Sequence, residues 1–184
     1  MELPTPKEVE QEGEAVAAAA VAKPMSKHLK LENASIEFSD DVTPRFTLVS
    51  DSADEDVKPL IIYPRHMPKI VKELPALYIM AKMAQTNLDM LKAADDKKNP
   101  PSDVLFEKTM IKSKIFTYKL RVDTFRFKSY IKLQMYVSPA ETPDKEYPCH
   151  GTIVFSTLDE IDTLRDFVSH WVTFSKMAEK EKAI

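Results

Sequence analysis

Residues 125–137 alternate apolar side chains with cations and tyrosines, in a pattern that could bind nucleic acid. Successive side chains of a β-strand point to opposite faces, so one set is expected to enter the core. The odd-numbered positions supply that inner set: Phe125, Phe127, Ser129, Ile131, Leu133, Met135 and Val137. The even-numbered positions supply the outer set: Arg126, Lys128, Tyr130, Lys132, Gln134 and Tyr136.

This outer set suits a single strand of DNA or RNA, because cations neutralise phosphates and aromatic rings stack on unpaired bases. A preceding strand at residues 114–122 adds Lys119 and Arg121 to the same face, if its apolar side chains point inward. The alternative is an ordinary solvated face of an antiparallel sheet, where lysine, arginine and tyrosine are also common. The absence of any aspartate or glutamate from residues 126–136 favours the binding interpretation.

The formal net charge of -3 argues at first against a nucleic-acid partner, but the charges are segregated. Residues 1–22 carry five glutamates against Lys7 alone, and residues 39–58 are also acidic. Residues 107–132 carry eight cations against Glu107 and Asp123. A local basic field selects partners by face rather than by total charge.

Residue types needed by several enzyme classes are missing. The chain has only two glycines, Gly13 and Gly151, so neither a P-loop nor a dinucleotide-binding fingerprint can be written. The adjacent pair Cys149-His150 is poorly suited to act as nucleophile and base. The four histidines show no metal-ligand spacing, and one cysteine cannot build a thiolate zinc site. We therefore expect a protein that is not an enzyme, with no metal and no cofactor.

Composition divides the chain into five segments. Residues 1–26 combine three prolines, five glutamates and an alanine-rich run, which predicts a disordered acidic tail. Residues 27–98 form a first strand-and-helix unit, residues 99–106 a linker, and residues 107–178 a second unit with the basic sheet face. A short C-terminal tail follows at residues 179–184.

In the first unit, period-2 patterns predict strands near residues 28–32, 36–38, 45–48 and 60–63. Apolar residues at spacings of three and four then predict a helix over residues 68–94.

The second unit repeats this order. Strands are predicted at residues 114–122, 125–137 and 152–155, with a tight turn at Asp123-Thr124. A capping box, Thr157-x-x-Glu160, opens the last helix. The expected fold is therefore α+β, with two β-sheet-plus-helix repeats packed as one pseudo-symmetric domain.

Two segments carry a resemblance to known proteins: residues 119–136, KLRVDTFRFKSYIKLQMY, and residues 151–165, GTIVFSTLDEIDTLR. Over residues 114–175 the chain resembles the transcriptional coactivator positive cofactor four family, and its doubled arrangement resembles the Whirly and Pur-alpha proteins. The resemblance implies single-stranded nucleic-acid binding on a curved sheet and oligomerisation through helices. The contacts carried over by it are Lys119, Arg121, Arg126, Lys128, Tyr130, Lys132 and Tyr136.

The predicted function is sequence-tolerant binding of single-stranded DNA or RNA in replication, transcription or RNA processing. The broad apolar helix faces predict a homo-dimer or homo-tetramer. A structural or assembly protein whose sheet face binds an acidic protein partner is the main alternative, and an enzyme of unrecognised type is a third. No apolar run is long enough to span a membrane. The single cysteine fits a reducing intracellular compartment, cytoplasmic or nuclear.

Overall fold

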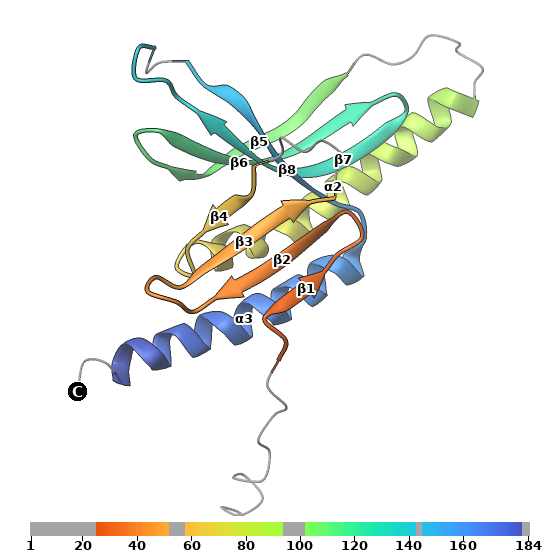
Figure 1. The fold of residues 1–184 in the computed structure, drawn as a ribbon. Coiled ribbons are helices and arrows are strands. Elements are labelled where there is room, and N and C mark those ends of the chain that lie inside the picture. Colours follow the sequence, from red (N-terminus) through yellow and green to blue (C-terminus); the bar gives the residue numbers. More distant parts are fainter. Residues whose placement is uncertain (1–24, 52–57, 94–101, 143–144, 182–184) are drawn as a thin grey trace, which may run out of the picture.

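The computed structural model describes residues 25–51, 58–93, 102–142 and 145–181. Over these ranges the chain is an α+β protein with two four-stranded antiparallel sheets and two long helices (Figure 1). The expected fold class is therefore confirmed. Each sheet takes its strands in chain order, and each is followed by a helix. That the two halves are related by pseudo-symmetry stays a prediction.

The first sheet follows the alternation seen in the sequence. Its strands are β1 (His28–Lys30), β2 (Ala34–Ser39), β3 (Arg45–Ser50) and β4 (Leu60–Ile62). In β2, the side chains of Ala34, Ile36 and Phe38 are buried while Glu37 is exposed. One face of this sheet therefore enters the core, as the period-2 pattern predicts.

The helix α2 (Met67–Ala93) has almost the predicted bounds. Its buried side chains recur at the spacing of an amphipathic helix: Met67, Ile70, Val71, Leu74, Leu77, Ala81 and Leu88. Pro75 lies inside the helix. Leu91 belongs to the predicted apolar stripe, but it is about half exposed near the helix end.

The second sheet is built from longer strands: β5 (Asp103–Lys112), β6 (Phe116–Phe125), β7 (Lys128–Val137) and β8 (Tyr147–Phe155). The sequence did not predict β5, which begins inside the segment assigned to the linker. It is an edge strand in which Val104 and Leu105 are both exposed, so it lacks the alternation by which strands are recognised. Strand β8 also begins earlier than the predicted residues 152–155.

The hairpin turn between β6 and β7 corrects a further prediction. Asp123 and Thr124 lie within β6, and the turn residues are Arg126 and Phe127, with φ angles of 47° and 61°. A type I′ turn requires positive φ at both central residues. Its backbone twist matches the twist of the two strands that it joins. Arg126 therefore lies at the hairpin tip, not on the outer face of a strand.

The helix α3 (Leu158–Glu181) begins at the predicted capping box. The Glu160 amide donates to Thr157 Oγ1 (3.2 Å), and the Thr157 amide donates to Glu160 Oε2 (3.2 Å). Glu160 also accepts a hydrogen bond from the Glu32 amide (2.5 Å), which ties the helix start to the loop between β1 and β2. Glu160 thus has a structural role at this helix start.

The two helices pack across the two halves of the chain. Helix α3 follows the second sheet but packs against the first, where Trp171 stacks on Phe38 with ring centroids 4.8 Å apart (Figure 1). Helix α2 follows the first sheet, yet Ser129 Oγ of β7 donates to its Ala81 carbonyl (2.6 Å). Buried side chains from both sheets and both helices form one hydrophobic cluster. Each helix therefore contacts the sheet of the other half of the chain.

The predicted tail at residues 1–26 lies outside the described residues, except for Met25 and Ser26. The Ser26 carbonyl accepts a hydrogen bond from Trp171 Nε1 (3.2 Å), so the chain contacts α3 at this point. Among the helices of the described ranges, none combines the length and the apolar character needed to cross a membrane.

Candidate nucleic-acid interface

The outer face of the second sheet has the predicted alternation over most of β6 and β7. The side chains of Leu120, Val122, Ile131 and Leu133 are buried on the inner face. The intervening positions face outward, and cross-strand pairing places Arg121 opposite Lys132. The sheet therefore brings Lys119, Arg121, Lys132 and Tyr136 together, as the sequence predicted.

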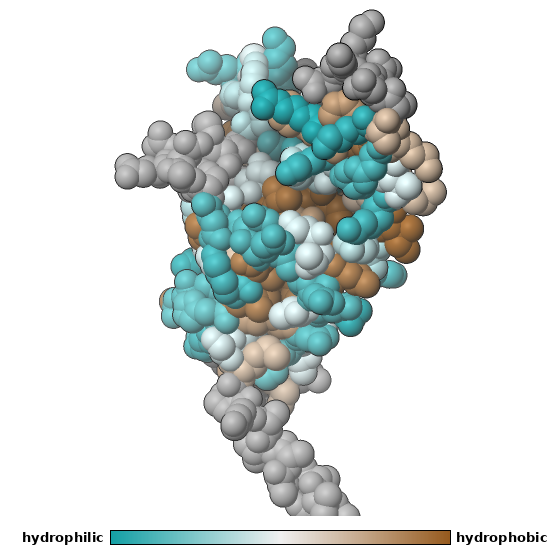
Figure 2. Space-filling view, turned by 90° about the vertical axis from the view of Figure 1, so that its right-hand side faces the viewer, coloured by the Kyte–Doolittle hydropathy of each residue, from teal (hydrophilic) through white to brown (hydrophobic). Residues whose placement is uncertain are grey.

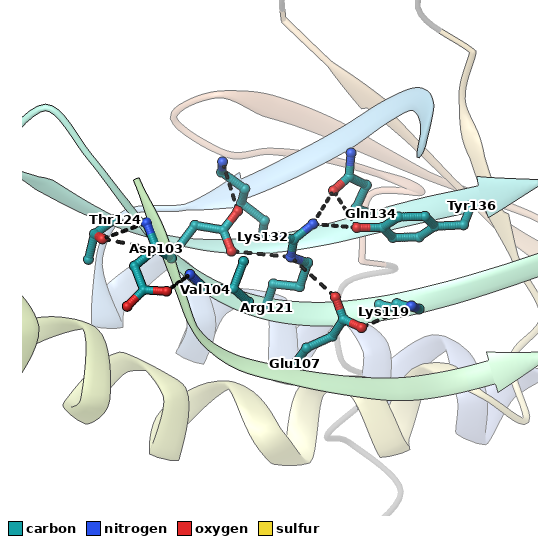
Figure 3. Close-up of polar contacts among 10 residues, drawn as sticks. Asp103, Val104, Glu107, Lys119, Arg121, Thr124, Lys132, Gln134 and Tyr136 are labelled. Carbon is teal, nitrogen blue, oxygen red and sulfur yellow. Dashed lines mark hydrogen bonds and ion pairs between the residues drawn. The ribbon is translucent and has the colours of Figure 1, made fainter. Parts of the chain in front are cut away.

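These central cations are paired with carboxylates from neighbouring segments (Figure 3). Lys119 Nζ lies 2.9 Å from Glu107 of β5 and 2.7 Å from Glu146 of the loop before β8. Its side chain is only 14% exposed. The sequence pointed to Glu107 as an acid of this basic segment, but neither its pairing with Lys119 nor that of Glu146 could be predicted, because these acids come from the strand on the far side of β6 and from a loop.

Asp123 holds the other two central cations. Its Oδ1 lies 3.2 Å from Arg121 Nε, and its Oδ2 lies 3.2 Å from Lys132 Nζ. Arg121 also lies 3.6 Å from Glu107. Two like charges directly across a strand pair would repel each other, so the shared carboxylate explains why Arg121 and Lys132 can face one another.

The titration of the central cations reflects this network. Burial acts to lower the pKa of Lys119, but hydrogen bonds to Glu146 and Glu107 outweigh it and raise the pKa. Burial likewise opposes the charge of Arg121, whereas its hydrogen bond to Tyr136 and the charges of Asp123 and Glu107 raise its pKa. Protein carboxylates thus neutralise much of the positive field at the centre of the sheet.

Tyr136 is on the outer face but does not offer a free ring. Its side chain is buried, and Lys119 Nζ lies 4.6 Å from the ring centroid. Its hydroxyl accepts a hydrogen bond from Arg121 and donates one to Gln134 Oε1 (3.1 Å). Tyr136 therefore holds Arg121 in place and is less accessible to a base than the sequence predicted.

The β6–β7 hairpin end, defined here as Phe125, Arg126, Phe127, Lys128 and Tyr130, differs from this centre. Arg126 and Lys128 are exposed, and neither forms an ion pair with any described residue. The Arg126 guanidinium lies 5.0 Å from the ring centroid of Phe125, which is 46% exposed. Tyr130 is half-buried beneath Lys132 Nζ, 5.4 Å from its ring centroid.

A small cleft of about 240 Å³ adjoins the hairpin end, between β7, the end of β8 and α2. Tyr78 and Lys82 of α2 line it together with Lys128 and Tyr130, and Lys82 Nζ lies 5.3 Å from the Tyr78 ring centroid. None of the described residues that line the cleft is acidic. Tyr78 and Lys82 were not predicted as site residues, although their i, i+4 spacing places them on one helix face.

The comparisons with known proteins leave the family open. No family model matches the chain, and no curated protein matches it either. Within the part of the chain that the structure describes, no group of three or more histidine, cysteine, aspartate or glutamate side chains could hold a metal ion. The interpretation of the site therefore depends on its geometry and charge.

Proposed function

We propose that the protein binds single-stranded DNA or RNA without catalysing a reaction, and that the β6–β7 hairpin end is the primary contact. One observation carries the proposal. Arg126 and Lys128 stand beside the rings of Phe125 and Tyr130, with no carboxylate partner among the described residues. Unpaired cations next to the exposed Phe125 and the half-buried Tyr130 suit a phosphate and an unstacked base.

The adjoining cleft extends this contact. Lys82 adds one further positive charge to that of Lys128, and Tyr78 adds aromatic surface to that of Tyr130. A strand that crosses the hairpin end would follow this line toward α2. Contacts of this kind recognise the backbone and the faces of bases, so the binding we propose tolerates many sequences.

The centre of the sheet plays a smaller part in this proposal. A phosphate there would have to replace Glu107, Asp123 or Glu146 as the partner of a cation that already makes its ion pairs. Such an exchange releases little counterion and gains little free energy. Lys119, Arg121, Lys132 and Tyr136 are therefore proposed to shape the sheet and to contact a strand only weakly.

A structural or assembly protein with an acidic partner is the second candidate, since the exposed cations of the hairpin end would also attract carboxylates. An acidic peptide cannot stack bases on Phe125 or Tyr130. Dependence of binding on these rings therefore distinguishes the two functions.

We also propose that the protein forms a homo-dimer or homo-tetramer through its helices. On α2, Ile79, Met83 and Met90 are each more than 60% exposed, at spacings that place them on one stripe. Figure 2 shows hydrophobic surface between hydrophilic patches on the side of the molecule toward which α2 runs. An exposed apolar stripe of this kind is typical of a subunit contact, and sedimentation velocity at micromolar concentration measures whether it is one.

The decisive experiment measures fluorescence anisotropy of labelled oligonucleotides with the wild-type protein and two tyrosine variants. The wild type should bind single strands more tightly than a duplex of the same sequence. Tyr130→Ala should weaken single-strand binding by roughly 1–3 kcal/mol. Tyr147→Ala removes an exposed tyrosine from the far end of the sheet and is the matched control, expected to bind as wild type does. Equal affinity for duplex and single strand, or equal behaviour of both variants, would refute the proposal.

A further inference from the structure

A second cationic groove lies at the other end of the second sheet, away from the hairpin end. It has a volume of about 590 Å³ and is formed where β4 and the start of α2 meet β5 and β6. Its basic side chains are Arg65, His66, Lys69 and Lys112, and none of the described residues lining it is acidic. The groove is therefore suited to an anion.

The cations of this groove are available for a ligand. Lys69 and Lys112 are exposed, and neither forms an ion pair with another residue of the described ranges. Arg65 donates a hydrogen bond from Nε to His66 Nε2 (3.1 Å) and lies 5.7 Å from the Tyr63 ring centroid. Glu179 lines a separate hollow beside Arg65, but Lys69 and Lys112 are not part of that hollow. The positive charge of the groove thus depends mainly on these two lysines, although the charge of Lys112 also acts on Glu146, whose pKa it helps to lower.

The other end of the groove is apolar. It shares Ile61, Phe116 and Tyr118 with an adjoining pocket of about 450 Å³, whose remaining lining is mostly aliphatic. The ring of Phe116 is 41% exposed there. Tyr118 Oη donates to the Ile61 carbonyl (2.9 Å), which joins the two sheets at the floor of the groove. A ligand that fits this site has a charged end and a flat apolar end.

We propose that this groove binds a nucleotide, with its phosphate held by Lys69, Lys112 and Arg65 and its base against Phe116 at the apolar end. The volume suits a ligand of this size, since small-molecule sites usually measure about 300–1,000 Å³. The proposal is independent of single-strand binding at the hairpin end. The nucleotide is either a free mononucleotide or one unit of a nucleic-acid strand.

His66 supplies an additional signature. Its pKa is lowered, first by burial and then by the charges of Arg65 and Lys69, so the ring is neutral at pH 7 and can accept from Arg65. Arg65 and Lys69 line the groove together with His66. Lys112 of β5 and Tyr63, which follows β4, line it as well. A bound phosphate counteracts that positive charge and raises the pKa of His66. The His66 ring then takes up a proton on binding, which offsets part of the affinity that is lost at low pH as the phosphate, with a second pKa of about 6, is protonated.

The test uses isothermal titration calorimetry of the full chain with adenosine monophosphate, adenosine and inorganic phosphate. Adenosine monophosphate should bind, and each of its two parts alone should bind at least about tenfold more weakly, because each fills one end of the groove. Lys69→Ala with Lys112→Ala should weaken binding of the monophosphate by about tenfold or more. Lys72→Ala, at an exposed lysine of α2 that does not line the groove, is the control and should bind as wild type does. Because the phosphate itself titrates at about pH 6, His66→Gln should make the loss of affinity at low pH steeper than in the wild type.

A single-stranded oligonucleotide identifies the source of the nucleotide. If the double lysine variant also weakens oligonucleotide binding, the groove takes a unit of a strand. If only the monophosphate is affected, the groove takes a free nucleotide. Failure of adenosine monophosphate to bind at millimolar concentration, or binding that the double variant does not change, overturns the proposal. Neither of these results affects the hairpin-end function, which Tyr130→Ala tests separately.

Discussion

The centre of the second sheet and its β6–β7 hairpin end contain the same residue types, but their charges are used differently. At the centre, Lys119 and Arg121 are between 14% and 17% exposed and are held by carboxylates. At the hairpin end, Arg126 and Lys128 are exposed and have no ion-pair partner among the described residues. The first group stabilises the sheet, and the second is free to bind an anion.

The cause of this difference is the register of the neighbouring strands. Strand β5 places Glu107 opposite Arg121, and β6 itself places Asp123 opposite Tyr130 beside Lys132. The hairpin tip extends beyond β8, which ends opposite Ile131, whereas β5 reaches as far as Thr124. A count of cations along one strand therefore overestimates the free positive charge wherever adjacent strands supply acids.

The largest expected effect concerns the alternation of β7, on which the comparison depends. Ile131 is 2% exposed in the core, so Ile131→Ala should lower the free energy of unfolding by about 2–5 kcal/mol. Tyr130→Ala, at the next position, should cost much less because Tyr130 faces outward and is half-buried. Chemical denaturation of both variants measures the difference. Equal destabilisation would contradict the assignment of faces.

The next effect separates the two groups of cations by their salt dependence. Arg126→Gln with Lys128→Gln should reduce the slope of log affinity against log salt by about 1.4, since each single-strand phosphate contact contributes about 0.7. Lys119→Gln with Lys132→Gln removes the same charge from the centre and should leave the slope unchanged. Anisotropy titrations of a single-stranded oligonucleotide at several salt concentrations test this pair. A larger change in the central variant would reverse the proposed roles.

Strongly periodic elements could be predicted from the sequence, whereas contacts between elements could not. The stripe of α2 and the Thr157–Glu160 capping box of α3 are local patterns, and both helices formed as expected. Strand β5 was missed because its side chains do not alternate between buried and exposed. The crossing of α2 and α3 onto opposite sheets depends on long-range packing, which no local pattern encodes.

The candidate site was predicted with the same limits. Period-2 alternation correctly placed Lys119, Arg121 and Lys132 on one face. The turn was placed at Asp123-Thr124, because these residue types are common in turns, whereas Arg126-Phe127 is an unusual pair for positive φ. The carboxylate partners became visible only once the register of three strands and the loop at Glu146 was known.

A smaller effect comes from releasing the central cations. Asp123→Asn removes the carboxylate that Arg121 and Lys132 share, so Lys132 becomes available to phosphate and Arg121 keeps only Glu107 as an acidic partner. Single-strand affinity should rise, and the salt slope should steepen by up to about 1.4. Asp40→Asn makes the same change of charge at an ion pair of the first sheet and should have no such effect. Anisotropy titrations of both variants provide the comparison, and unchanged binding in Asp123→Asn would show that a strand does not reach the centre.

The smallest expected effect is the acid dependence of the central network, measured at Glu146. Its hydrogen bond from Lys119 lowers the pKa of the Glu146 carboxyl, with a further contribution from Thr117 Oγ1, which donates at 3.1 Å. Because the folded-state pKa lies below the ordinary value near 4.5, the carboxylate contributes stability above that pH and loses it as the pH falls through the folded-state value. Glu146→Gln should therefore lower the free energy of unfolding by a few tenths of a kcal/mol to about 1 kcal/mol at pH 7 and leave it nearly unchanged in strong acid. Glu141→Gln, at an exposed glutamate of the same loop, should show no such convergence with wild type. Denaturation curves between pH 3 and about pH 7 measure the stability of both variants. Because the hairpin end has no such acid partner, Glu146→Gln should leave single-strand binding unchanged at neutral pH.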